Sequence, residues 1–289
     1  MPEKYYIIKS NLSFNNKSYD KYYYVNISSS KKEDNILVGG INIKCVQIII
    51  NKKKNTGLLE LVQHHEKCSF FETLKDGIET VDLVKNSLSF AVNLYPEISK
   101  YELVDNSFIK CKNGKRISLA DLLFVKYGKT WYENKFGAIL SKQRKNTVNL
   151  TKSGILNNLN SKIEISFEDF IKEYHNEDFF ENQKNINVIK KIYNPDITLK
   201  EYLDYFFKNK YDCRYYQYVF SKFIGTSLQG LEWIIEKNTI ENYDVNTIII
   251  ETEKITKHTD LKLLRNNLEK IKRKEDKKKG GGIFNNGYC

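Results

Sequence analysis

Acidic side chains and imidazoles gather between positions 58 and 71, where the sequence reads LLELVQHHEKCSFF. Successive side chains of a β-strand point to opposite faces, so an extended conformation places Glu60, His64 and Glu66 on one face and His65 on the other. A carboxylate or a neutral imidazole in such a position can accept a proton from a substrate. The same residues also fit ordinary solvated strand positions, so this stretch supplies candidate bases and leaves both interpretations open.

His64, His65 and Cys68 also form a compact group of potential metal ligands, and Cys45 lies on the strand expected to pair with them. Adjacent histidines of a strand face opposite ways and cannot easily share one ion. A structural zinc site needs four ligands, and no fourth is evident. The sequence therefore predicts no metal site here. It also contains no phosphate-binding P-loop, no GxSxG and no HExxH motif.

A second candidate site is the turn LKDGIET, which precedes a stretch with helical periodicity at 80–95. Backbone amides at a helix N-terminus bind phosphate groups, and Gly77 would allow the backbone to approach a ligand closely. Thr80 would add a hydroxyl group and Lys75 a positive charge, whereas Glu79 would oppose a bound diphosphate. An ordinary turn leading into a helix explains the same residues equally well.

The sequence pattern of the strands and helices that must position these residues predicts an α+β fold, with a mostly antiparallel sheet and flanking helices. Runs rich in β-branched and aromatic residues predict strands at 5–14, 22–28, 44–50 and 58–71. The last two flank the polar segment NKKKNTG, which is typical of a hairpin. A strand at 100–104 follows the first helix, and then a helix at 118–127 with Ser118 as its N-cap. Asp105-Asn106-Ser107, after that strand, favours an Asx-turn, although it could instead line a cleft.

The pattern changes near position 146, where strand signals fade and helix starts multiply. Thr198 and Glu201 form a capping box, and Ser166 with Asp169 marks another helix start. The predicted domains are therefore an α+β domain at 1–145, a smaller all-helical domain at 146–258, and a basic helix with a disordered Gly-rich tail at 259–289.

From about 46 to 140, the order of elements resembles the GNAT (GCN5-related N-acetyltransferase) family. That family has a long hairpin, a cofactor-binding turn, a helix, a strand, a second helix and a final strand. The hairpin, the turn LKDGIET, the helix TVDLVKNSLSFAVNLY and the strand KYELVDNS match in order. TWYENKFGA is similar to the family's aromatic-Tyr-Glu-x-x-Gly-Phe segment, with Phe136 and Gly137 in reversed order. At the cofactor turn, Leu74 and Glu79 depart from the family pattern, and Gly77 matches it.

The resemblance implies an N-acyltransferase that transfers an acyl group from acetyl-CoA to an amine. It implies Tyr132 as the acid that protonates the leaving thiolate, with Glu60, Glu66 or His64 as the base. It also implies that Lys75, Gly77, Glu79 and Thr80 contact the cofactor. A non-enzymatic descendant of the fold that serves in interactions is the alternative, and the altered turn leaves activity open between the two.

The chain of 289 residues carries a net charge of +11, of which the run Lys270–Lys279 contributes seven basic and two acidic residues, or +5. Such a tail can attract nucleic acid or an anionic surface, or can simply be a solvated helix end. Frequent Lys, Asn, Ile and Tyr indicate an AT-rich genome, such as that of a large DNA virus. No membrane span or secretory signal is evident, and the five scattered cysteines indicate no disulfide framework, so we expect an intracellular protein.

Overall fold

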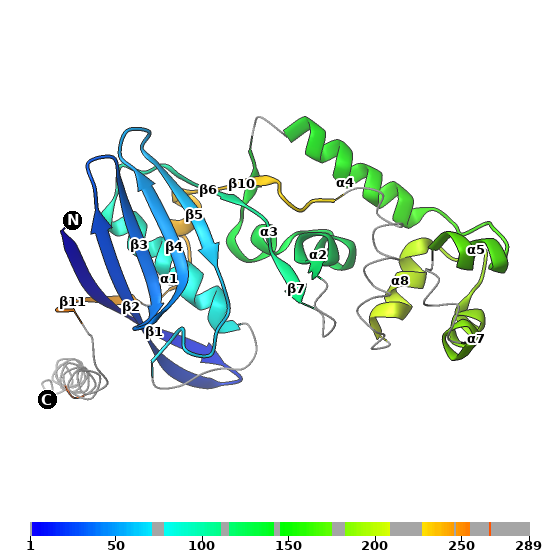
Figure 1. Cartoon of the computed structure of the whole chain (residues 1–289), viewed down its shortest axis with the longest axis horizontal. Coiled ribbons are helices and arrows are strands. Elements are labelled where there is room, and N and C mark those ends of the chain that lie inside the picture. The colour runs from blue at the N-terminus through cyan, green and yellow to red at the C-terminus, as the bar shows by residue number, and fades with distance from the viewer. Residues whose placement is uncertain are drawn as a thin grey trace, which may run out of the picture.

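The computed structural model describes residues 2–70, 78–110, 116–141, 145–174, 183–208, 227–245, 247–254 and 266. Within these ranges, nine strands form one sheet, in the order β11-β1-β2-β3-β4-β5-β6-β10-β9 (Figure 1). The sheet contains β1 (Glu3–Phe14), β2 (Lys17–Ser29), β3 (Glu33–Gly40), β4 (Ile43–Asn51), β5 (Thr56–Val62), β6 (Lys100–Val104), β9 (Ile139–Leu140), β10 (Glu232–Glu236) and β11 (Thr247–Thr252). A separate pair consists of β7 (Phe108–Lys110) and β8 (Arg116–Ser118).

The described helices are α1 (Ile78–Leu94), α2 (Leu119–Tyr127), α3 (Trp131–Phe136), α4 (Lys145–Asn160), α5 (Phe167–Tyr174), α7 (Gln183–Ile192), α8 (Leu199–Lys208) and α10 (Lys237–Glu241). None of them is both long and apolar enough to cross a bilayer. The protein is therefore α+β with a large, mostly antiparallel sheet, as the sequence predicted.

Strands β1 to β5 form an antiparallel meander whose hairpins follow from the turn residues. Asn15 and Asn16 join β1 to β2 with positive φ angles of 49° and 59°. Asparagine tolerates this left-handed conformation, and two such residues match the twist of a tight hairpin. The predicted hairpin around NKKKNTG is also present, as β4 and β5.

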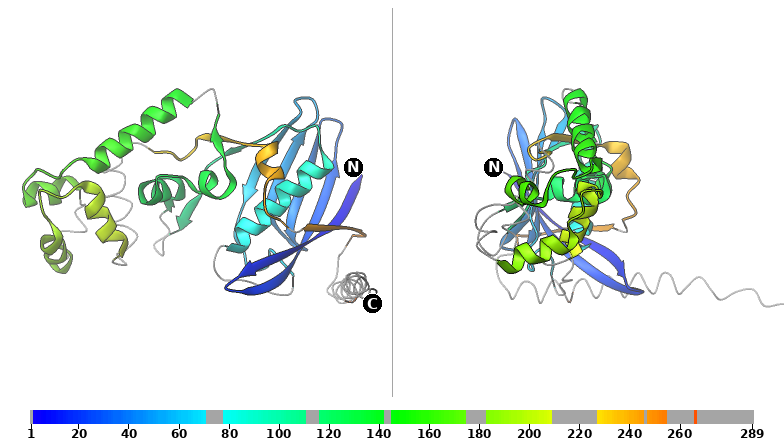
Figure 2. Two further views of the ribbon diagram at one scale, coloured as in Figure 1. Left: turned by 180° about the vertical axis from the view of Figure 1, so that it is seen from behind. Right: turned by 90° about the vertical axis from the view of Figure 1, so that its right-hand side faces the viewer.

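One face of the sheet is covered by α1, which lies behind the strands in Figure 1 and in front of them in the left view of Figure 2. Its periodic apolar side chains, including Leu83, Val84, Leu88 and Ala91, are buried in the main hydrophobic core. The apolar residues that recur at three- and four-residue spacing in the sequence thus form the core-facing side of this helix.

The segment 145–208 builds a second core with α2 and is inserted between two strands of the sheet. Phe124 of α2 packs there with Ile155 of α4, Phe170 of α5 and Tyr202 of α8. The predicted caps at Ser118, Ser166 and Thr198 are all formed. In Figure 1 these helices extend away from the sheet.

The prediction that 146–258 is entirely helical is wrong at two places, because 232–236 and 247–252 are the strands β10 and β11. β10 pairs with both β6 and β9, and β11 pairs with β1 at the far edge of the sheet. The apolar run around Trp233 fits a strand as well as a helix, and burial of Trp233 and Ile235 in the main core decides between them.

Gly57 fixes the junction between the antiparallel meander and the rest of the sheet. It pairs in parallel with Tyr101 of β6, and a Cβ atom at Gly57 would lie 2.3 Å from Cδ1 of the Tyr101 ring. β5 and β6 can approach each other only because this position has no side chain.

We therefore predict that Gly57→Ala lowers the free energy of unfolding by about 1–3 kcal/mol, the usual cost of overpacking a core. Urea denaturation followed by tryptophan fluorescence measures this change. Gly154→Ala in α4 is the matched control, because nothing lies within 4 Å of its Cβ position. It should be neutral or stabilising by up to about 1 kcal/mol. Equal effects at both sites would contradict the proposed role of Gly57.

Candidate functional site

β5 and β6 run side by side for only two residue pairs, Gly57 with Tyr101 and Leu58 with Glu102. Beyond these pairs the two strands are not hydrogen-bonded to each other, although both continue, and Figure 1 shows them taking different directions. In sheets with parallel strands, ligands bind outside the carboxyl ends of strands that part in this way. The divergence of β5 and β6 is therefore the candidate site.

A β-bulge in β5 accompanies the divergence. Leu59 pairs with Ile48 of β4, and Leu61 pairs with Gln47, so Glu60 between them has no partner of its own. An extra residue of this kind bends its strand, increases the local twist and redirects its side chain. Glu60 is exposed and stands where β5 turns away from β6.

After β5, residues 63–70, which we call the strap, run back toward β2. Phe70 donates its backbone N–H to the carbonyl of Tyr22, at 2.9 Å. A Cβ atom at Gly40 would lie 2.1 Å from the backbone oxygen of Lys67, so the strap rests directly against the β3–β4 hairpin. Together these contacts fix the chain just before the proposed cofactor turn.

A disulfide between Cys45 of β4 and Cys68 of the strap adds a covalent link. The prediction that the cysteines form no disulfide is wrong for this pair. The two residues are 23 positions apart, and the strap brings them together by crossing back over β4. A sulfur atom in this bond is not a thiolate metal ligand. Among the described residues, no three His, Cys, Asp or Glu side chains are grouped as a metal site would require.

The strap also holds the first turn of α1, which contains two of the predicted cofactor residues. Nδ1 of His64 lies 2.9 Å from Oγ1 of Thr80, and Ser69 donates its hydroxyl to the carboxylate of Glu79. Glu79 also lies 3.6 Å from Nζ of Lys21, and both side chains are buried. The charge of Glu79, expected to oppose a diphosphate, is thus paired inside the protein.

A buried polar network continues along α1 from this point. Asp82 accepts hydrogen bonds from Tyr23, Ser10 and Asn86, at 2.7, 3.0 and 3.0 Å. Burial raises the pKa of Asp82, and these hydrogen bonds offset only part of that shift. The network fixes the N-terminal half of α1 against β1 and β2.

Tyr132, the predicted acid, lies at the start of α3 and is buried in the main core. Its ring packs edge-on against Trp131, with ring centres 4.9 Å apart. Burial, and to a lesser degree the charge of Asp105, raises the pKa of the Tyr132 phenol. The phenol therefore stays protonated at neutral pH, as an acid catalyst must.

Asp105, directly after β6, was considered in the sequence as part of an Asx-turn or a cleft lining and was not among the predicted site residues. Its Oδ1 accepts hydrogen bonds from the backbone and hydroxyl of Ser107, so the predicted Asx-turn is present. Its Oδ2 is buried without a partner in the described part of the chain. Burial raises the pKa of Asp105, and Asp121 raises it further. An Asp at the carboxyl end of a predicted strand was the signal in the sequence that could have identified it as a candidate site residue.

The structure brings together only part of the predicted site. His64, Glu79 and Thr80 meet at the strap, whereas Glu60 and Glu66 are exposed separately. Tyr132 lies with Asp105 at the end of β6. Lys75 and Gly77 lie outside the described residues, as does the basic run Lys270–Lys279.

Comparisons with known proteins do not assign this arrangement to a family. No family model matches the chain, and searches of curated proteins and of solved structures find no significant match.

The buried carboxyl group of Asp105 leads to a test by pH. Its folded-state pKa is raised above the unfolded value, so its contribution to stability is present at low pH and is lost as pH rises through the folded pKa. Asp105→Asn removes this loss. We measure the free energy of unfolding of this variant and of the wild type by urea titration. The value for the variant minus the value for the wild type should increase as pH rises from about 4 to about 8. A difference independent of pH would contradict burial of the ionisable group.

Proposed function

We propose that this protein is a GNAT-like N-acyltransferase, which uses acetyl-CoA to acylate an amine. The observation that carries the proposal is the β5–α1–β6 unit, in which two parallel strands, joined along the chain by a helix, meet briefly and then part. The order of elements supports it. The β4–β5 hairpin, α1, β6, α2 and β9 occur in the order of the resemblance noted in the sequence, with the β7–β8 pair and α3 as additional elements.

The side chains near the diverging strands suit this chemistry. When bound, acetyl-CoA supplies an acyl thioester that an amine can attack. The C–N bond forms as the C–S bond breaks, and the leaving thiolate needs a proton. Tyr132 is the donor that the resemblance implies, and its phenol carries the proton that the thiolate needs.

Glu60 is the base that we assign. It is the bulge residue at the divergence, and its exposed carboxylate can accept the proton that the amine loses. His64 fits this role less well because its Nδ1 is engaged with Thr80, and Glu66 lies on the strap beyond the end of β5.

The start of α1 is the end of the site that would hold the phosphate groups. A helix N-terminus presents free amides and a partial positive charge, which favour an anion. The pairing of Glu79 with Lys21 removes the nearby negative charge that the sequence had placed in opposition. Thr80, whose hydroxyl contacts His64, has its side chain mostly buried, so we assign it to positioning the turn.

Binding provides the first test. Isothermal titration should detect acetyl-CoA, and Gly77→Trp should weaken binding at least tenfold by blocking the close approach of the backbone. Gly154→Trp in α4, far along the chain from the turn, is the matched control and should bind normally. The absence of heat at millimolar acetyl-CoA would rule out the transferase.

Catalysis provides the second test. Tyr132→Phe keeps the packed ring but removes the proton, so kcat should fall by about 100-fold or more with little change in KM. Thiol release with a panel of primary amines measures this. Tyr243→Phe is the control, because that buried hydroxyl donates to the backbone of Phe136 and should affect stability only. Unchanged turnover in Tyr132→Phe would remove its role as the acid.

A further inference from the structure

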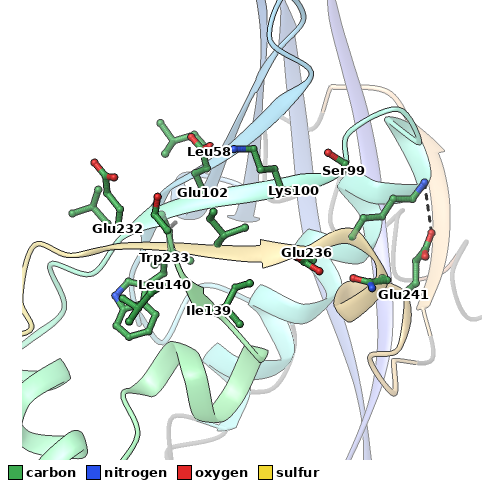
Figure 3. Close-up of a pocket in the computed structure, with 16 residues that line it drawn as sticks. Leu58, Ser99, Lys100, Glu102, Ile139, Leu140, Glu232, Trp233, Glu236 and Glu241 are labelled. Atoms are coloured by element: carbon green, nitrogen blue, oxygen red, sulfur yellow. Dashed lines mark hydrogen bonds and ion pairs between the residues drawn. The ribbon is translucent and has the colours of Figure 1, made fainter. Parts of the chain in front are cut away.

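No described helix or strand covers one face of the sheet at its β6–β10–β9 end. Tyr101 and Leu103 of β6 point into the main core, so Lys100, Glu102 and Val104, which alternate with them, face the other way. In β10, Trp233 and Ile235 are in the core, and Glu232, Ile234 and Glu236 face outward. This outer face contains a depression of about 1020 Å³, drawn in Figure 3, and we call it the β6–β10 face.

The β6–β10 face carries exposed apolar side chains among its charged ones. Ile139 of β9 is 50% exposed and Val104 is 44% exposed, and both line the depression with Leu58 and Ile234. Isolated exposed apolar residues are common on protein surfaces, whereas these four lie together in one hollow.

The same face is acidic, in a chain whose net charge is +11. Four glutamates and two lysines line the depression. Lys100 lies 2.5 Å from Glu102, and Lys237 lies 3.6 Å from Glu241, so both lysines are already paired. Glu232 and Glu236 form no ion pair with any described residue. Figure 3 shows Glu232 near Leu58 at one end of the face and Glu236 nearer the other end.

We propose that the β6–β10 face docks a basic amphipathic helix of a partner protein. A sheet face is normally covered by a helix, as α1 covers the opposite face. The five residues of β10 span the length of about 11 helical residues, or three turns. An apolar stripe would cover Ile139, Val104 and Ile234, and flanking lysines or arginines would reach Glu232 and Glu236.

The test uses the full chain and a fluorescein-labelled 14-residue peptide, with leucines at helical spacing and lysines elsewhere. Fluorescence anisotropy should show saturable binding that weakens as salt increases. The same peptide with glutamates in place of lysines should not bind. Acetyl-CoA is omitted, so this result is independent of the proposed acyltransferase activity.

Variants locate the binding. Glu232→Gln combined with Glu236→Gln should weaken the affinity about tenfold, since each exposed pair is worth a few-fold. The control, Glu251→Gln with Glu253→Gln beside the opposite edge strand, should leave affinity unchanged. Ile139→Ser should weaken binding at every salt concentration, and Leu156→Ser in α4, equally an exposed apolar residue, should not. Thermal unfolding by circular dichroism verifies that each variant is folded.

Three results would overturn the proposal. These are equal binding of both peptides, unchanged affinity in the Glu232 and Glu236 double variant, and self-association of the protein in sedimentation that Ile139→Ser abolishes. The last would make the β6–β10 face a contact between copies of this chain.

Discussion

The ring of Tyr101 occupies the space where a side chain at position 57 would lie, and Gly57 is what allows it. This contact joins the antiparallel meander to the strands that carry the rest of the fold. It is short, because the bulge at Glu60 bends β5 immediately afterward. The Tyr101 ring packed on Gly57 therefore determines where β5 and β6 are joined, and the bulge at Glu60 determines where they part. The candidate site depends on that parting.

Polar groups buried beneath α1 fix the start of that helix on the sheet. Lys21 with Glu79, and Asp82 with Tyr23, fix the start of the helix to β2. Burying charged groups is costly unless they are paired, and such a network is worth more for holding a geometry than for stability. The strap and its disulfide act on the same region from the other side. The start of α1 is thus held on both sides.

Local signals in the sequence predicted local structure well. The periodic apolar residues at 80–95 gave a helix observed at Ile78–Leu94, and the caps at Ser118 and Thr198 are formed as their residue types require. The stretch around Trp233 was misjudged because a short apolar run carries no reliable period. Its partners β6 and β9 lie far away in the sequence, and only that pairing makes it a strand.

The candidate site was predictable only where its residues are close in sequence. Tyr132 was proposed from the resemblance and Thr80 from its place at a helix start, whereas the burial of the Asp105 carboxylate depends on packing that no single segment reveals. The pairing of Glu79 with Lys21 joins positions 58 residues apart on different elements, so the sequence could only suggest a charge that opposes a bound diphosphate. The uncovered face of β6 and β10 likewise appears only when the strand order is known.

Hydrogen exchange followed by mass spectrometry, with and without saturating acetyl-CoA, tests the link between the parted strands and the cofactor most directly. If the ligand sits where β5 leaves β6, amide exchange should slow at 59–64 and 74–80, and the β1–β2 hairpin should be unaffected. Exchange that stays the same at both segments, or slows only in the helices of 145–208, would contradict the account.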